Sequence, residues 1–144
     1  MDDGTGPRHS VSVAAVIVND DDRVLAVQRR DNGRWEPPGG VLELDESIDD
    51  GLTREVREET GLSVTIDALT GAYKNMPRGI VALVFRCRPT SGHLTTGPET
   101  AQLCWLTLDQ VRDAMDEAYA VRIFDALDAG PPHVRTHDGT SLLA

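Results

Sequence analysis

Three carboxylates within five residues, Glu55, Glu58 and Glu59, are the feature of this sequence best suited to chemistry. At about 100° per helical residue, they fall within a sector of about 100° on one helix face, one turn deep. Hard divalent cations bind such oxygen ligands, and Mg²⁺ typically takes one or two carboxylates together with substrate phosphate. The cluster therefore predicts a metal site acting on a phosphorylated substrate. A solvated acidic helix face is the common alternative.

An apolar stripe on the same helix indicates that the carboxylates are held in place. Ile48, Leu52 and Val56 recur every four residues, which is typical of a helix face packed on a core. Gly51 stands one turn before Glu55, where a glycine costs roughly 1 kcal/mol relative to alanine. We expect its missing side chain to leave room over the carboxylates for a metal and a phosphate.

The charges around Arg54 suggest how the glutamates are oriented. Asp50 and Glu58 each stand four residues from Arg54, so either carboxylate can form a charge-assisted bond with it. Like charges at this spacing cost only about 0.2–0.5 kcal/mol per pair, so repulsion alone does not require a metal.

The 23 residues from Gly40 to Leu62 resemble the Nudix box. The specified positions of that motif are occupied by Gly40, Glu46, Arg54, Glu55, Val56, Glu58, Glu59, Gly61 and Leu62. Nine specified residues in a fixed frame make a strong signal. The segments 25–30 and 35–40 also look like the family's approach to the box, and the resemblance extends over about residues 10 to 128.

The resemblance implies a fold and a reaction. It implies an α+β fold of the Nudix type, an α/β/α sandwich around a mixed β-sheet, and Mg²⁺- or Mn²⁺-dependent hydrolysis of a nucleoside diphosphate linked to another group. By the same resemblance, Glu55 and Glu59 are metal ligands and Glu58 either ligates or holds the attacking water. The carbonyl of Gly39 is a further candidate ligand, and Arg54 orients the glutamates. Glu46 would brace the loop against the helix.

Several candidate site residues lie outside the box. Glu99, in a loop just before a predicted strand, is an alternative to Glu58 as general base. Arg30 ends a predicted strand, and similar arginines in the family touch substrate phosphate. Asn75 and Arg78 lie in a loop that could line the base or sugar pocket. For each of these residues an ordinary surface role is the competing interpretation.

The sequence is compatible with more than one substrate class. Pro77 stands 15 residues beyond Leu62, a spacing that resembles the ADP-ribose-cleaving members, although turn chemistry also explains a proline here. A nucleoside-triphosphate hydrolase is an equal candidate. A nucleotide-sensing Nudix-like module without catalysis and an acidic protein-docking face are the rival classes.

Composition predicts one domain and restricts its partners. At 144 residues we expect a flexible leader over 1–9, one domain over 10–130 and a tail over 131–144. The net charge of −10, of which −6 falls within residues 40–62, argues against binding of a nucleic-acid polymer. The absence of an 18-residue apolar run and the polar first residues predict a cytoplasmic protein without a membrane span. Many family members dimerise, so a homodimer is compatible with the resemblance.

The order of elements follows from periodicity and turn residues. Strands are predicted over 11–18, 24–29, 64–73, 80–88 and 102–106, with a turn-rich connector over 89–98. Gly61 should end the box helix. Thr107 should cap a helix over 108–118 that continues or restarts over 120–127, and the last twelve residues should be loose. Cys87 and Cys104 are expected to be reduced core residues, and all four histidines to lie on the surface.

Overall fold

A computed structural model of the chain describes residues 6–143, so the first five residues of the expected leader lie outside it. Its elements, in chain order, are β1 (Ser10–Ile17), β2 (Val24–Arg29), β3 (Trp35–Glu36), β4 (Gly39–Val41), α1 (Ile48–Thr60), β5 (Leu62–Asn75), β6 (Ile80–Gly92), β7 (Thr100–Leu106), α2 (Leu108–Ala114), α3 (Glu117–Leu127) and β8 (His133–His137). No helix within residues 6–143 is long and apolar enough to span a membrane.

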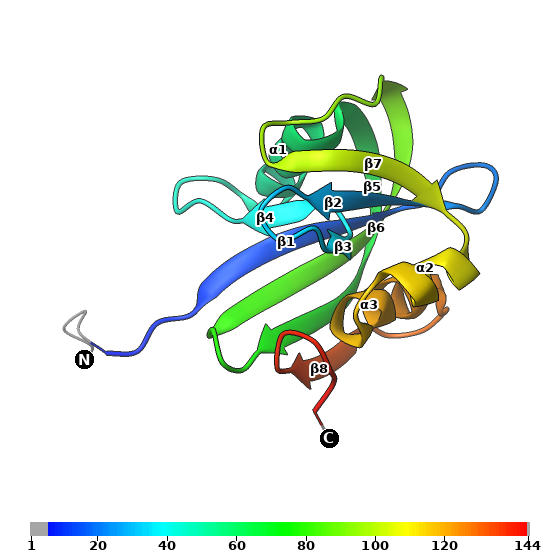
Figure 1. The fold of residues 1–144 in the computed structure, drawn as a ribbon. Coiled ribbons are helices and arrows are strands. Elements are labelled where there is room, and N and C mark those ends of the chain that lie inside the picture. Colours follow the sequence, from blue (N-terminus) through cyan, green and yellow to red (C-terminus); the bar gives the residue numbers. More distant parts are fainter. Residues whose placement is uncertain (1–5, 144) are drawn as a thin grey trace.

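The strands form two sheets between two layers of helix (Figure 1). The larger sheet has the order β4-β1-β6-β5-β8, and the smaller has the order β3-β2-β7. In the larger sheet β1 runs parallel to β6 and β5 parallel to β8, while the remaining pairs are antiparallel. The predicted α/β/α sandwich around a mixed sheet is therefore confirmed.

Strand β1 shows how alternation of side chains separates the two layers. Ala15 packs in a buried cluster that contains Leu52 of α1, whereas the next residue, Val16, packs in the cluster that contains Ile123 of α3. Consecutive strand side chains point to opposite faces of a sheet. The apolar run of β1 is buried on both faces for this reason, and it ties α1 and α3 to one central sheet.

Helix α1 begins and ends where its sequence predicts. The Ser47 side chain accepts a hydrogen bond from the backbone N–H of Asp50 at 3.1 Å, and Gly61 ends the helix with a φ of 78°. Leu52 is fully buried, as the apolar stripe requires, but Ile48 in the first turn is 40% exposed. The helix is therefore anchored by its middle and its last turns.

The C-terminal part differs from the sequence prediction in two ways. The helix capped by Thr107 ends at Ala114, and extended backbone at Met115 separates it from α3. The expectation of a loose tail was wrong for His133–His137, which pairs in parallel with β5 as an edge strand. Its pairing partner lies about 60 residues earlier in the chain, so local patterns could not reveal it. Strand β6 likewise extends to Gly92, into the expected connector.

Two predictions of burial were also wrong. Cys87 is buried and free as expected, but Cys104, also free, is exposed on β7. His137 is only 1% exposed, so it is a core residue and not a surface one. Both errors arise because the exposed face of an edge element depends on which neighbour covers it.

Candidate active site

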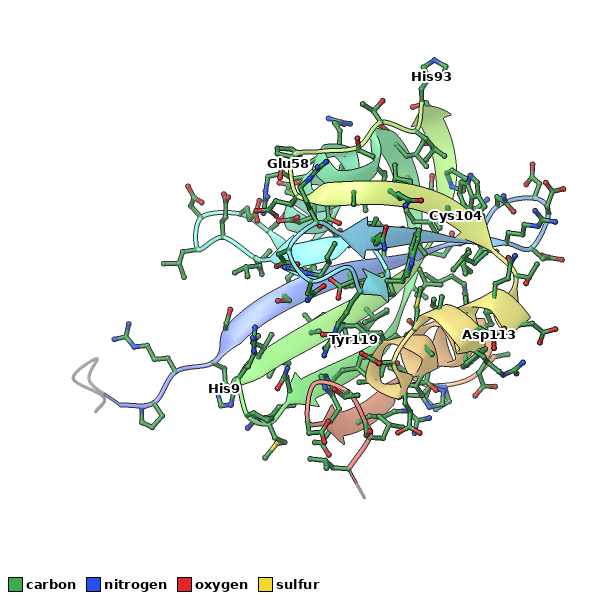
Figure 2. The ribbon with its side chains drawn as sticks, viewed as in Figure 1. His9, Glu58, His93, Cys104, Asp113 and Tyr119 are labelled. Atoms are coloured by element: carbon green, nitrogen blue, oxygen red, sulfur yellow. The ribbon has the colours of Figure 1, made fainter. Side chains whose placement is uncertain are left out.

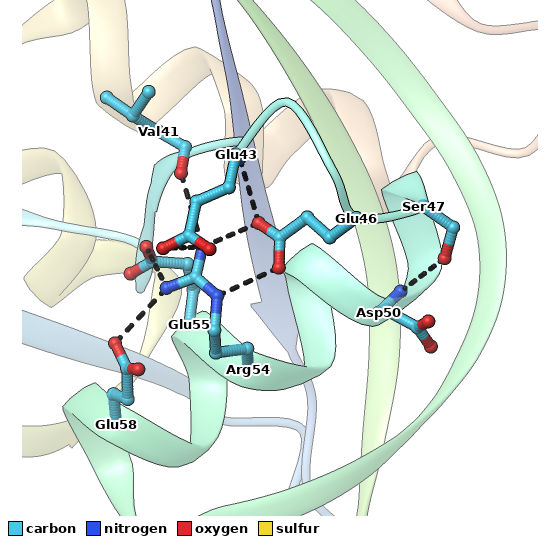
Figure 3. A network of polar contacts seen from close by, with 8 residues as sticks. All are labelled: Val41, Glu43, Glu46, Ser47, Asp50, Arg54, Glu55 and Glu58. Atoms are coloured by element: carbon cyan, nitrogen blue, oxygen red, sulfur yellow. Dashed lines mark hydrogen bonds and ion pairs between the residues drawn. The ribbon is translucent and has the colours of Figure 1, made fainter.

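Arg54 connects the loop before α1 to the glutamates of the helix (Figure 3). Its Nη2 and Nε donate to the two carboxylate oxygens of Glu46 at 2.7 and 2.9 Å. Its Nη1 donates to Glu55 at 2.9 Å and, at 3.3 Å, to Glu58. The guanidinium therefore holds three carboxylates at once, in a fork geometry that lysine cannot reproduce. Asp50, the other expected partner, is not among the acids that Arg54 contacts, and its backbone N–H donates to the side chain of the N-cap residue Ser47.

Glu46 braces the loop onto this arginine. One of its oxygens also accepts the backbone N–H of Glu43 at 2.9 Å. The hydrogen bond from Arg54 lowers the pKa of Glu46 to about 2, so this carboxylate is ionised at neutral pH.

Gly51 has a different role from the one we expected. A Cβ at this position would meet the side chain of Leu42 and the carboxylate of Glu46. The glycine thus allows the loop to pack closely on α1, and our prediction that it opens space over Glu55 was wrong.

The short strand β4 lies directly against the two inner carboxylates. A Cβ on Gly40 would overlap the carboxylate of Glu55. The backbone of Gly39 forms a hydrogen bond with the carboxylate of Glu59, which partly opposes the desolvation that raises the pKa of this group. Gly40 therefore allows the backbone to approach Glu55 closely, whereas the missing side chain of Gly39 allows β4 to pack on Val13 and Ala14 of β1.

The three helix glutamates have different environments. The side chain of Glu58 is 60% exposed, whereas that of Glu55 is 13% exposed. Glu59 is half-buried, and its desolvation, with the charges of Glu55 and Glu36, raises its pKa to about 8. Desolvation is also the main cause that raises the pKa of Glu55. Within the inner pair, Arg54 pairs with Glu55, whereas no described cationic side chain hydrogen-bonds to Glu59.

This charge predicts a pH dependence of stability in metal-free protein. The pKa of Glu59 is raised in the folded state from 4.5 to about 8, so the fold binds its proton more tightly than the unfolded chain does. The resulting stabilisation is complete below pH 4.5 and is lost as the pH rises through 8. Urea unfolding in EDTA should show this loss, and Glu59→Gln should flatten the profile. An identical pH profile in the variant would contradict the assignment.

Two further residues of the site were missed by the sequence analysis. Glu36 on β3 is buried enough for desolvation to raise its pKa, and its charge acts on Glu59. Arg29 donates to Glu36 at 3.2 Å and to Asp31 at 2.6 Å. The pairing of β3 with β2 brings Glu36 and Arg29 together, and no local signal reports that register.

The loop before β7 reaches the same region. The backbone N–H of Arg30 donates to the carbonyl of Glu99 at 2.9 Å, and its guanidinium donates to the carbonyls of Pro98 and Thr100 at 3.1 Å. The charge of Glu99 contributes to the raised pKa of Glu55, which places the two carboxylates near each other. In this structure Arg30 holds the loop that carries Glu99.

A cavity of about 550 Å³ adjoins the inner carboxylates. Each of the five strands of the larger sheet contributes to its lining, and so do α3 and the loop after β2. Gly39, Gly40 and Glu36 line it at the end next to α1, and the predicted residues Asn75 and Arg78 line it as well. The structure thus brings the proposed substrate residues 75 and 78 to the same cavity as Gly39 and Gly40, while the helix glutamates lie behind these glycines and do not line it.

The donor set fits a hard divalent cation. Glu55 and Glu59 present oxygen ligands in a half-buried setting, and no described cationic side chain hydrogen-bonds to Glu59. Within residues 6–143 no three His, Cys, Asp or Glu side chains are gathered closely enough to hold a metal unaided. This arrangement matches Mg²⁺, which usually keeps waters and binds one or two carboxylates plus substrate phosphate. Zinc, which favours histidine and cysteine ligands, does not fit.

The fold and the site define a hydrolase of phosphoric anhydrides built on an α/β/α sandwich, and comparison with known proteins gives its family. Residues 8–127 match the NUDIX domain, and the chain belongs to that family. It is 58% identical over 137 residues to a MutT-like protein of Streptomyces ambofaciens, covering 95% of this chain and 89% of that protein.

More distant relatives agree with this assignment. An ADP-ribose pyrophosphatase of Methanocaldococcus jannaschii is 29% identical over 102 residues, which cover 66% of this chain and 60% of that protein. The fold is similar to a crystal structure of an ADP-ribose pyrophosphatase from Streptococcus suis, with a TM-score of 0.74 and 23% identity over 90% of this chain and all of that one. The predicted family and the predicted class of enzyme are confirmed.

Proposed function

We propose that the protein is a Mg²⁺- or Mn²⁺-dependent pyrophosphohydrolase that cleaves a nucleoside diphosphate linked to another group. The observation that carries this proposal is the pair of half-buried carboxylates, Glu55 and Glu59, beside a cavity lined by arginines. Two adjacent acids with raised pKa values, of which only Glu55 pairs with a cation, favour a bound divalent metal over a solvated acidic surface.

The roles of the residues follow from their positions. Glu55 and Glu59 would hold the metal, which supplies charge neutralisation on the diphosphate and a bound water as nucleophile. Arg54 fixes the position of Glu55 while Glu46 fixes Arg54. We assign proton acceptance from the attacking water to Glu58 or Glu99, both of which lie at the exposed rim of the inner pair. The water's oxygen bonds to one phosphorus as the bridging P–O bond breaks.

The cavity's cations suit an anionic nucleotide. Arg29 and Arg78 line the cavity and would bind phosphate oxygens, with Arg30 acting indirectly through the loop that it holds. ADP-ribose-like compounds and nucleoside triphosphates are both candidate substrates. The name of the archaeal relative and the position of Pro77 in the cavity lining favour the ADP-ribose class. The free cysteines agree with a proposed cytoplasmic location.

A substrate panel tests this proposal. Purified protein is incubated with ADP-ribose, dinucleoside polyphosphates, and normal and oxidised deoxynucleoside triphosphates, each with Mg²⁺, Mn²⁺ or EDTA. We expect release of nucleoside monophosphate from at least one class, only with a metal present. Folded protein that binds metal but cleaves none of these compounds would contradict the proposal and favour a nucleotide-sensing module.

A further inference from the structure

Arg122 on α3 is a buried cation that the proposed reaction does not use. It is 7% exposed, and its Nε has no hydrogen-bond acceptor among the described residues. The guanidinium lies over the rings of Tyr119, at 4.6 Å, and Tyr73, at 5.2 Å. Figure 2 marks Tyr119, which lies between α3 and the sheet. A buried charge without a counter-charge is costly, so it is expected where a ligand completes it.

No acid of the described chain pairs with Arg122. Glu36 exerts an attraction on it but is itself hydrogen-bonded to Arg29. Asp125, on the same helix, accepts from Tyr73 at 2.7 Å and from Arg135. Burial lowers the pKa of Arg122, in agreement with a charge that lacks compensation. The two aromatic rings position the guanidinium but cannot accept its in-plane N–H groups.

His137 provides a second hydrogen-bond donor next to the guanidinium of Arg122. The backbone N–H of Gly139 donates to its Nδ1 at 2.9 Å, so the proton of a neutral ring must be on Nε2. Burial and the charge of Arg122 lower the pKa of His137, which keeps the ring neutral. Nε2 lies 3.3 Å from Nη2 of Arg122, which is also only a donor. These two donors lie side by side with no acceptor between them, and one acceptor oxygen placed beside the pair could accept from both.

Asn75 adds a third donor. It pairs with His137 in the register of β5 and β8, and both residues line the cavity. Its Oδ1 accepts the backbone N–H of Arg78 at 3.2 Å, which leaves its Nδ2 as a donor without an acceptor among the described residues. Asp138, the acid nearest in sequence, accepts the N–H groups of its own turn. We call Asn75, Arg122 and His137 the donor cluster.

The donor cluster lines the same cavity as Gly39 and Gly40 of β4, against which the inner carboxylates lie. The inner carboxylates contact β4, whereas Asn75 is on β5 and His137 on β8, and Arg122 reaches from α3 to Tyr73 of β5. With strands about 4.8 Å apart, β4 and β8 are separated by about 19 Å across the sheet. A substrate whose diphosphate lies at the metal face can therefore extend a second group to the donor cluster.

We propose that the donor cluster binds a negatively charged, oxygen-rich group, a phosphate or a carboxylate, carried by the substrate on the far side of its diphosphate. This inference rests on the proposed function, which supplies the diphosphate at the other end. Two adjacent donors, one of them a full cation, with Asn75 on the neighbouring strand in the same cavity lining, match such a group in charge and in hydrogen bonding. A neutral sugar would leave the charge of Arg122 uncompensated.

Binding of inorganic phosphate tests the donor cluster without catalysis. In EDTA, phosphate is titrated into ¹⁵N-labelled protein, and the resonances of the His137 ring and of the Arg122 Nε–H are followed. We expect saturable shifts of both in the wild type, with the His137 ring shift abolished in Arg122→Met and weakened in Arg122→Lys. Arg112→Met is the matched control, because Arg112 also lies over a ring, that of Phe124, but is exposed and paired with Asp109. Absence of shifts in the wild type overturns the inference, and this result needs no variant to fold.

Kinetics then separate this inference from the proposed function. For ADP-ribose carrying a 2′-phosphate, Arg122→Met should raise KM by about 30-fold, with little change in kcat. For ADP-ribose itself the change should be much smaller, and free phosphate should compete with the phosphorylated substrate. Equal effects on both compounds, or non-competitive inhibition by phosphate, overturn the inference. If the enzyme turns over a substrate but phosphate causes no NMR shifts, the inference alone is overturned. If phosphate causes the shifts but no substrate is turned over, the proposed function is overturned.

Discussion

Replacing Glu59 by glutamine should lower kcat by more than about 10²-fold, beyond the loss typical of groups that only support a metal ligand. The reason is the loss of an anionic oxygen in the inner pair, where Glu59 is desolvated and adjoins Glu55. The amide can still accept the hydrogen bond from Gly39, so the fold should be retained. Steady-state kinetics on the best substrate of the panel and thermal unfolding measure the two effects separately.

Asp49→Asn is the matched control for this variant. Asp49 is an exposed acid in the first turn of the same helix and lies away from the inner pair. It should retain normal turnover. Near-normal activity of Glu59→Gln would remove Glu59 from the site, and equal losses in both variants would indicate a general effect of charge on the helix.

Arg54→Lys should have the second-largest effect. Lysine keeps the charge but cannot hold both oxygens of Glu46 and the carboxylate of Glu55 in the same geometry. Displacement of a catalytic group by about 1 Å can cost about 10²-fold in rate, so we expect a loss of that order in kcat. The loss should come with weaker Mn²⁺ binding, since Glu55 is no longer fixed.

Arg57→Lys controls for the substitution itself. Arg57 is exposed one turn later on α1, where it donates to the Ser63 hydroxyl at 3.1 Å. Its replacement should leave both kcat and metal binding unchanged. If Arg54→Lys behaved in the same way, the guanidinium network would be a loop brace without influence on the glutamates.

Local patterns explain why so much of α1 could be predicted. Its cap at Ser47, its stop at Gly61 and its buried side chain at Leu52 all depend on residues within a turn or two. The same holds for β2, whose predicted bounds are those observed. The order of strands came only from the family resemblance, because periodicity carries no information on which strands pair.

Contacts between distant segments account for the errors. The role of Gly51 depends on the path of the preceding loop, which places Leu42 over the helix. Glu36 enters the site through the register of a two-residue strand. His137 is buried because β8 pairs with β5 far earlier in the chain. Each of these positions is determined by contacts between segments that are distant in the sequence, which local patterns do not report. The donor cluster could not be predicted for the same reason, since its residues come from β5, α3 and β8.

The central claim is that the inner face of α1 holds a divalent metal, and calorimetric titration of Mn²⁺ tests it most directly. Wild-type protein and Glu55→Gln are titrated at the same neutral pH, with Asp49→Asn as control. The structure predicts a saturable site in the wild type and the control, lost or strongly weakened in Glu55→Gln. Equal Mn²⁺ affinity in all three proteins would contradict the claim and return the acidic helix face to an ordinary solvated surface.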